Sequence, residues 1–345
     1  MRRGQRSGRR HLTAPLKVGV IGVGSLGFHH ARILRDMETV AFAGFVESRE
    51  DRATEVAAEL GIRRYQDEAA LLADVDAVTI VVPTSAHFAV ARAALEAGKH
   101  VFIEKPITAT LEEAEELLHI AERNGCIVQI GHVERFNRAV RAALPYVSRP
   151  RFIESERLAL FSLRGSDVAV VLDLMIHDID LVLTLVNDTA EEISAVGVPV
   201  LTPMLDIANA RVTFSSGAVA NITSSRISRD RVRKIRIFQE SGYMSLDLGA
   251  GTGHFFRLKE KMDPSKPPAG PVNITDYVDH IALTAPEGEP LRLEFDSFVS
   301  ALNGEGPVVV TGEDGKRALA VALRIVAEIE RTRPALTGQP AASRA

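Results

Sequence analysis

The sequence predicts an α/β protein in which a doubly wound parallel sheet is followed by a second α/β domain with a large, open and mostly antiparallel sheet. Two observations support this fold class. From Leu16 to about residue 131, strand and helix patterns alternate with short turns, which is typical of a parallel sheet with crossover helices. After residue 131, one apolar helix precedes several segments with the two-residue alternation of strands.

In the first domain, strands are expected at "LKVGVIG", "VAFAGFVE", "AVTIVVP", "HVFIEKP" and "CIVQIG". A weaker unit around Tyr65 would bring the number of strands to six. The helices expected between them are "SLGFHHARILRDM", "REDRATEVAAEL", "SAHFAVARAALEA" and "TLEEAEELLHIAERN", three of which end at glycines. Thr110 and Glu113 form a capping box that marks the start of the last of these helices.

The second domain is expected to begin with an apolar helix at residues 168–186. Strands follow at "DIANARVTF", "AVANITSSRIS", "KIRIFQE" and "YMSLDLG", and two helices around "RLEFDSFVSALN" and "EDGKRALAVALRIVAEIERT" close the chain. In "IANARVTF", apolar side chains alternate with polar ones, so one face of that strand is covered. We therefore predict a disordered extension at 1–15, a nucleotide-binding domain at 16–131, a substrate-binding and oligomerisation domain at 132–331, and a flexible tail at 332–345.

The overall composition excludes several functional classes. The net charge of −4 gives no general attraction to nucleic acid or to an anionic membrane, and the single cysteine rules out an intrachain disulfide or a cysteine-based zinc site. The longest apolar run carries acidic residues, so no membrane span is expected. The arginine-rich start does not resemble a secretory signal. We expect a soluble cytoplasmic protein with no metal and no nucleic-acid partner.

The turn "GVGSLG" lies between the first strand and the first helix, as in a dinucleotide-binding Rossmann domain. Gly22 permits the tight turn, Gly24 lets the backbone approach a pyrophosphate, and Gly27 lets helix and strand pack closely. Glu47 ends the second strand, where a carboxylate can bond the ribose hydroxyls and repel a 2′-phosphate. NAD is therefore favoured over NADP, although Arg49 is close enough in sequence to accommodate the extra phosphate.

Two further strand ends, "VVPTSAH" and "FIEKP", should converge on the same edge, because ligands in open parallel sheets bind outside the carboxyl ends of the strands. Pro83 and Pro106 can be explained as strand terminators. Lys105 is different, because it is a cation placed between an apolar strand and a proline where the nicotinamide ring should lie. We therefore interpret Lys105 as a functional residue.

The apolar helix contains Asp173, His177, Asp178 and Asp180, although burying such groups is costly unless they are paired or functional. Asp173 and His177 are four residues apart, so on a regular helix they share a face. A satisfied core pair is the alternative interpretation. A metal site is disfavoured because Asp178 points about 100° away from His177. Asp180 is interpreted as a structural partner.

Taken together, "GVGSLG", "EKP" at 104–106 and "DLMIHDID" at 173–180 resemble the glucose-fructose oxidoreductase, inositol dehydrogenase and MocA (Gfo/Idh/MocA) family over roughly residues 16–331. The resemblance implies an open C-terminal sheet that builds homodimers or homotetramers. It also implies that Lys105, Asp173 and His177 are catalytic. The implied cofactor-binding residues are Gly22, Gly24, Ser25, Leu26, Gly27, Glu47, Pro83, Thr84, His87, Glu104 and Lys105.

Those three catalytic positions suit the oxidation of a secondary alcohol. Histidine titrates near the working pH, so His177 would be the general base. Asp173 would orient His177 and support its protonated form, while Lys105 would hold the alcohol oxygen and stabilise its developing charge.

Within the family, "GHVERFNRAV" and "SSRISRDRVRKIRIFQ" are most similar to bacterial UDP-N-acetylglucosamine 3-dehydrogenases, which make a 3-keto nucleotide sugar on the way to lipid A precursors. A diphosphate favours arginine, so the candidates for binding it are Arg135, Arg157, Arg164, Arg226 and Arg229. Asn137 is a further predicted substrate-binding residue. Solvated or interface charge is the alternative for this basic run. A free polyol or inositol is the alternative substrate. A non-catalytic NAD-binding regulator and an enzyme that never releases its cofactor are further alternatives.

Overall fold

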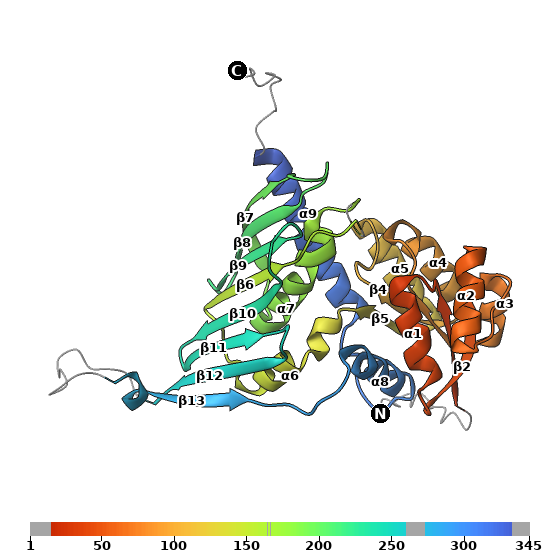
Figure 1. Ribbon diagram of the computed structural model, residues 1–345, viewed down its shortest axis with the longest axis horizontal. Helices are drawn as coiled ribbons and strands as arrows, with labels where there is room; N and C mark the ends of the chain where they lie inside the picture. Colours follow the sequence, from red (N-terminus) through yellow and green to blue (C-terminus); the bar gives the residue numbers. More distant parts are fainter. Residues whose placement is uncertain (1–14, 164, 166, 260–272, 333–345) are drawn as a thin grey trace, which may run out of the picture.

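The computed structural model describes residues 15–163, 165, 167–259 and 273–332. These residues form two domains that lie side by side, with the large sheet on one side and the smaller parallel sheet on the other (Figure 1). The predicted extension and tail fall almost entirely outside the described residues.

The first sheet has five parallel strands in the order β2-β1-β3-β4-β5 among the described residues. Its strands are β1 (Leu16–Ile21), β2 (Val40–Val46), β3 (Ala77–Ile80), β4 (His100–Glu104) and β5 (Val128–Gly131). The weaker sixth unit predicted near Tyr65 is reduced to a single parallel bridge, between Arg64 and Phe45 on the outer side of β2. With that bridge counted as a residual strand, the order is the 3-2-1-4-5-6 of dinucleotide-binding domains.

The helices of this domain are α1 (Ser25–Arg35), α2 (Glu50–Leu60), α3 (Glu68–Asp74), α4 (Thr84–Glu96) and α5 (Leu111–Asn124). The predicted capping box is confirmed, since the Thr110 side chain accepts from the Glu113 N–H and the Glu113 side chain accepts from the Thr110 N–H. Gly61 and Gly125 end their helices in the left-handed conformation. Such residues satisfy the last helical carbonyls without steric penalty.

The second sheet confirms the predicted large and mostly antiparallel architecture. Its order is β13-β12-β11-β10-β6-β9-β8-β7, in which only β6 and β9 are parallel. The strands are β6 (Phe152–Leu158), β7 (Ala190–Val198), β8 (Ile207–Phe214), β9 (Val219–Ser225), β10 (Val232–Gln239), β11 (Gly242–Asp247), β12 (Thr252–Leu258) and β13 (Val278–Leu283).

One face of this sheet is covered by helices, and α7 and α9 lie between it and the first domain (Figure 1). The remaining helical elements are the 3₁₀ turns η1 (Val133–Phe136), η2 (Leu144–Tyr146) and η4 (Ile274–Asp276), the π-helix η3 (Val171–Met175), and the α-helices α6 (Arg138–Ala143), α7 (Ile176–Val186), α8 (Pro290–Leu302) and α9 (Gly312–Thr332). The single helix predicted at 168–186 is therefore a π-helical turn followed by an α-helix.

Helix α8 follows the large sheet in sequence but packs against the first domain. Phe295, Phe298 and Val299 belong to the same hydrophobic cluster as Val18 and Val20 of β1. Arg32 of α1 also pairs with Glu289, the residue before α8, at 2.6 Å. The chain therefore crosses back to the first domain after the large sheet, so residues from both ends of the sequence surround the junction.

Candidate active site

The glycine turn after β1 has the geometry expected of a pyrophosphate cradle. Gly22 has φ +89°, and a Cβ there would lie 2.5 Å from the Val81 carbonyl oxygen. A Cβ on Gly27 would lie 1.9 Å from the Gly22 carbonyl oxygen, whereas one on Gly24 would meet only an Arg49 nitrogen at 3.9 Å. Gly22 and Gly27 are thus required by packing, and Gly24 leaves open space at the N-terminus of α1. These residues fit a bound dinucleotide.

Glu47 follows β2 at the same edge of the sheet. Its carboxylate accepts hydrogen bonds from the Val23 N–H at 3.0 Å and from the Arg49 N–H at 3.2 Å, and the Arg49 side chain lies 3.3 Å away. Burial raises the pKa of Glu47, but these hydrogen bonds outweigh it and hold the pKa below its ordinary value. The carboxylate is therefore ionised and fixed beside the glycine turn.

The ends of β3 and β4 meet this edge as predicted. Pro83 and Thr84 begin α4, and Glu104 ends β4 immediately before Lys105. His87 was predicted to bind the cofactor, but its ring is buried between two loops. Its Nδ1 lies 2.8 Å from the Pro106 carbonyl oxygen and its Nε2 lies 3.0 Å from the Val82 carbonyl oxygen. His87 therefore ties the two loops together and has no free ring nitrogen to offer a cofactor.

Lys105 reaches from the first domain to the π-helical turn of the second. Its Nζ donates to the Asp173 carbonyl oxygen at 2.6 Å and lies 3.4 Å from the Asp173 carboxylate. This contact joins residues 68 positions apart and fixes the amine at the domain junction. Irregular π-helical turns of this kind often occur at functional sites.

His177 stands one turn further on, at the start of α7. Its Nδ1 is buried without a hydrogen-bond partner among the described residues, and its ring lies edge-on to that of His132, with 6.4 Å between centroids. Burial lowers the pKa of His177 well below its ordinary value, and the positive charges of Lys105 and Arg157 lower it further. The imidazole is thus neutral and able to accept a proton.

The expected support of His177 by Asp173 was not found, because no hydrogen bond joins them within the described part of the chain. The prediction assumed a regular α-helix through both residues. The π-helical turn ends at Met175, between them, and the Asp173 carboxylate lies beside the Lys105 amine. Asp173 is thus positioned to act on the lysine.

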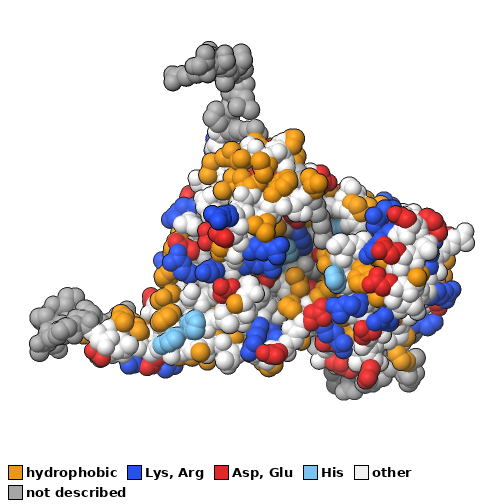
Figure 2. Space-filling model, in the orientation of Figure 1, with side chains coloured by type: hydrophobic (Ala, Val, Ile, Leu, Met, Phe, Trp, Pro, Cys, Tyr) orange, Lys and Arg blue, Asp and Glu red, His pale blue; other side chains and the backbone are white. Residues whose placement is uncertain are grey.

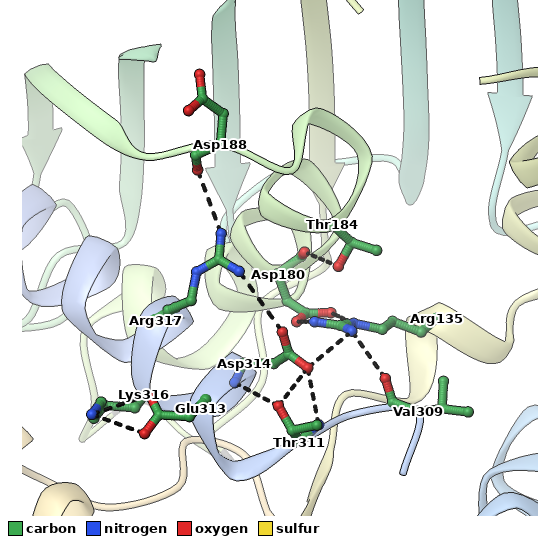
Figure 3. A network of polar contacts seen from close by, with 10 residues as sticks. All are labelled: Arg135, Asp180, Thr184, Asp188, Val309, Thr311, Glu313, Asp314, Lys316 and Arg317. Atoms are coloured by element: carbon green, nitrogen blue, oxygen red, sulfur yellow. Dashed lines mark hydrogen bonds and ion pairs between the residues drawn. The ribbon is translucent and has the colours of Figure 1, made fainter. Parts of the chain in front are cut away.

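The other acidic residues of the helix are neutralised by arginines. Asp178 accepts two hydrogen bonds from Arg157 of β6, at 2.8 and 2.9 Å. Asp180 accepts from Arg135 of η1, whose guanidinium also lies 3.4 Å from Asp314 at the start of α9 (Figure 3). The interpretation of Asp180 as a structural partner is confirmed. These pairs connect α7 to the sheet, to η1 and to α9.

Comparison with known proteins identifies the family. A family model described as "Oxidoreductase family, NAD-binding Rossmann fold" matches residues 16–132, and one described as "GFO/IDH/MocA C-terminal domain" matches residues 139–245. A UDP-N-acetylglucosamine 3-dehydrogenase from Acidithiobacillus ferrooxidans is 39% identical over 320 residues, covering 91% of this chain and 97% of that protein. The chain belongs to the Gfo/Idh/MocA family.

Solved structures agree with this assignment. The structure of the Acidithiobacillus ferrooxidans enzyme aligns with a TM-score of 0.83 at 37% identity and covers 92% of this chain and 99% of its own. A myo-inositol 2-dehydrogenase from Thermotoga maritima is 26% identical in sequence, over 92% of this chain and 97% of its own. This member of the family is therefore an oxidoreductase with a nicotinamide-nucleotide domain, acting on a CH–OH group.

The arginines predicted to bind substrate are mostly engaged elsewhere. Arg135 and Arg157 form the buried pairs above, and Arg226 is buried and donates to the Gly165 and Val168 carbonyls. Asn137 is also buried, bonding Glu134 at 3.0 Å and the Leu248 carbonyl at 2.9 Å. Each of these four side chains supports the fold, and their predicted part in substrate binding stays a prediction. Arg164 lies outside the described residues, and Arg229 is exposed.

A buried carboxylate of α8 had no role among the predictions from the sequence. Glu294 of α8 is fully buried, and neither carboxyl oxygen has a partner among the described residues. Burial raises its pKa well above the ordinary value, and the negative charges of Glu104 and Asp180 raise it further. Glu104 keeps a lowered pKa despite burial, because His30 hydrogen bonds to it at 3.1 Å. Glu294 is therefore protonated while Glu104 is ionised.

A signal for Glu294 was present in the sequence. It occupies the apolar face of an amphipathic helix, between Leu291 and Phe298 at helical spacing, where a carboxylate is rarely found. His132 follows β5 nearby, and both of its ring nitrogens are buried without partners in the described structure. Burial lowers the pKa of His132, so it is neutral.

The described residues contain no group of three or more His, Cys, Asp or Glu side chains arranged to hold a metal ion. No helix among them is long and apolar enough to cross a membrane. Asp178, which the rejected metal interpretation would have required, is occupied by Arg157.

Replacing Glu294 with glutamine should stabilise the protein increasingly as the pH rises. The folded state binds a proton at Glu294 that the unfolded state releases above about pH 4.5, so the wild type loses stability with rising pH. Glutamine removes this loss. We expect the melting temperature of Glu294→Gln to exceed that of the wild type by about 2 °C or more at pH 8, and by less at pH 5.

The matched control is Glu305→Gln, an exposed glutamate just after α8. Its melting temperature should follow that of the wild type at both pH values. A destabilised Glu294→Gln variant at pH 8 would show that Glu294 is charged and paired in the folded protein.

Proposed function

We propose that this protein oxidises a secondary hydroxyl of a nucleotide sugar of the UDP-N-acetylglucosamine type, at C3, by hydride transfer to NAD. The observation that carries the proposal is the contact of Lys105 with Asp173 at 2.6 Å, one helical turn before His177, at the edge where the glycine turn also lies. The similarity to the Acidithiobacillus ferrooxidans enzyme, over nearly the full length of both chains, supports the substrate class. A free polyol or inositol is the second candidate, supported by the Thermotoga maritima relative.

NAD is the proposed cofactor in preference to NADP. The Glu47 carboxylate is held ionised beside the glycine turn by Val23 and Arg49. A fixed negative charge there accepts hydrogen bonds from ribose hydroxyls and repels a 2′-phosphate. Arg49 is paired with this carboxylate, which reduces its availability for a phosphate.

The proposed mechanism assigns one task to each polar group of the site. His177 is neutral and takes the proton of the substrate hydroxyl through Nε2, since Nδ1 is buried. The Lys105 ammonium donates to the same oxygen and stabilises the negative charge that develops there. Asp173 positions the lysine. NAD, held at the glycine turn and by Glu47, would supply the hydride acceptor.

We further propose a homodimer or homotetramer formed through the open face of the large sheet. A row of stacked aromatic rings crosses strands β10 to β13, at the β13 end of the sheet. The rings in this row are those of Phe238, Tyr243, Phe256 and His280. Stacked aromatic side chains are enriched where one protein surface meets another.

Removing the proposed base should abolish most of the turnover. His177→Ala is expected to lower kcat by about 10²- to 10⁴-fold, because a positioned proton-transfer group contributes that much. The dissociation constant for NAD, measured by titration calorimetry, should stay within about twofold of the wild type. The control is His119→Ala, an exposed histidine of α5. Undiminished turnover in His177→Ala would remove His177 from the mechanism.

The pH dependence of kcat/KM should show the lowered pKa of His177. The base must be unprotonated to accept the substrate proton, so a lowered pKa keeps the enzyme active further into the acid range. We expect the acidic limb of the kcat/KM profile to have its midpoint clearly below 6.5, the ordinary value for histidine. A midpoint at or above that value would contradict a neutral, buried base.

The substrate class is tested by following nicotinamide reduction at 340 nm with NAD and a panel of UDP sugars and polyols. UDP-N-acetylglucosamine should give kcat/KM at least about 100-fold above that of myo-inositol, because a site built for polar substrate groups rejects analogues that lack them. The reverse preference would establish the polyol function. Binding of NAD with no reduction by any compound, in single-turnover as well as steady-state measurements, would favour a regulator.

A further inference from the structure

Arg233 lies on the helix-covered face of the large sheet, at the end of β10 nearest the domain junction. It pairs directly with Arg157 of β6, and residues opposite each other in neighbouring strands point to the same face. Ile235 and Ile237, which follow at two-residue spacing, are fully buried on this face. Arg233 therefore points toward η1 and α7, where Arg157 meets Glu134 and Asp178.

The guanidinium of Arg233 forms weaker ion pairs and is more exposed than that of Arg157. The Arg157 side chain is 5% exposed and lies 2.8 Å from both Glu134 and Asp178. The Arg233 side chain is 55% exposed, and its carboxylate neighbour in the described structure, Glu134, is 3.8 Å away. Arg233 thus keeps donor groups available to a ligand.

This available cation is close to the proposed base. His177 lies one residue before Asp178, the partner of Arg157, and Arg157 is the residue opposite Arg233. Besides burial, the positive charges of Lys105, Arg157 and Arg233 all lower the pKa of His177. The surface is hollowed where the two domains meet, and Lys and Arg side chains gather on the wall formed by the large sheet (Figure 2).

The charge around Arg233 suits a dianion. Arg229 and Arg231 precede it in the same exposed segment, with Asp230 as the intervening acid. Three arginines and one aspartate give residues 229–233 a net charge of +2, which exceeds the single net negative charge of Arg157 with Glu134 and Asp178. Arginine binds phosphate oxygens through paired, charge-assisted hydrogen bonds.

We infer that Arg233 binds the diphosphate of a nucleoside diphosphate sugar whose sugar ring lies against His177. In such a substrate the diphosphate is bonded to C1 of the ring that carries the reacting hydroxyl, so a diphosphate ligand must stand close to the base, as Arg233 does. This assignment rests on the proposed function and names the residue that distinguishes a nucleotide sugar from an uncharged polyol.

The test compares Arg233→Gln with Arg236→Gln. Arg236 is in the same strand and equally exposed, at 56%, but it points to the open face and pairs with Glu154. UDP is titrated calorimetrically into each NAD-saturated protein, and kinetics are measured with UDP-N-acetylglucosamine. Arg233→Gln should raise the Kd for UDP and the KM for the sugar about 10- to 100-fold, the effect of losing a charged hydrogen bond. Its kcat should change by less than about threefold, and Arg236→Gln should match the wild type within about twofold.

Three other outcomes would overturn the assignment of Arg233, and the first of them would also overturn the proposed function. If the wild-type protein binds neither UDP nor UDP-N-acetylglucosamine, the proposed nucleotide-sugar function is overturned and this assignment with it. If the wild type binds UDP and Arg233→Gln binds it equally well, only the assignment is overturned. Equal weakening in Arg233→Gln and Arg236→Gln also overturns the assignment, because the effect then follows net charge and not position.

Discussion

The structure depends on the neutralisation of two buried carboxylates in α7. Asp178 and Asp180 are almost completely buried in a strongly apolar helix, and an unpaired charge there would be strongly destabilising. Arg157 and Arg135 supply the matching charges from β6 and η1. Because each arginine contacts a second acid as well, Glu134 or Asp314, the two networks fix α7 against the sheet, η1 and α9 together. The position of the candidate active site follows from this arrangement.

The candidate active site is assembled across the domain junction that those networks hold in place. Lys105 belongs to a strand end of the parallel sheet, and its amine reaches the π-helical turn that precedes α7. Burial, reinforced by the positive charges of Lys105, Arg157 and Arg233, lowers the pKa of His177, which suits a group that accepts a proton. The two arginines that hold α7 are paired with carboxylates, so the proposed anionic substrate would need other cations, and the exposed Arg233 is the one assigned to it above.

Much of the fold and part of the candidate site could be predicted from local sequence patterns. The glycine turn, the strand ends that carry Glu47 and Lys105, and the capping box at Thr110 all depend on residues close together in sequence, and the structure agrees with their expected positions. Predictions that depended on which group a side chain contacts in the folded protein were less accurate. Arg135, Arg157 and Arg226 were expected to face a ligand, but their partners come from distant segments, and His87 bonds loop carbonyls that no spacing rule identifies.

The sequence by itself determined the two-sheet α/β fold, the nucleotide-binding edge and the residue types available for acid–base chemistry, because periodicity and turn chemistry act over a few residues. Only the tertiary structure decided which charges were free to act. The π-helical turn separated Asp173 from His177, burial in the packing of α8 raised the pKa of Glu294, and the pairing of β10 with β6 placed Arg233 beside Arg157. Charge state and availability depend on burial and on through-space neighbours, and both are settled only when distant segments pack together.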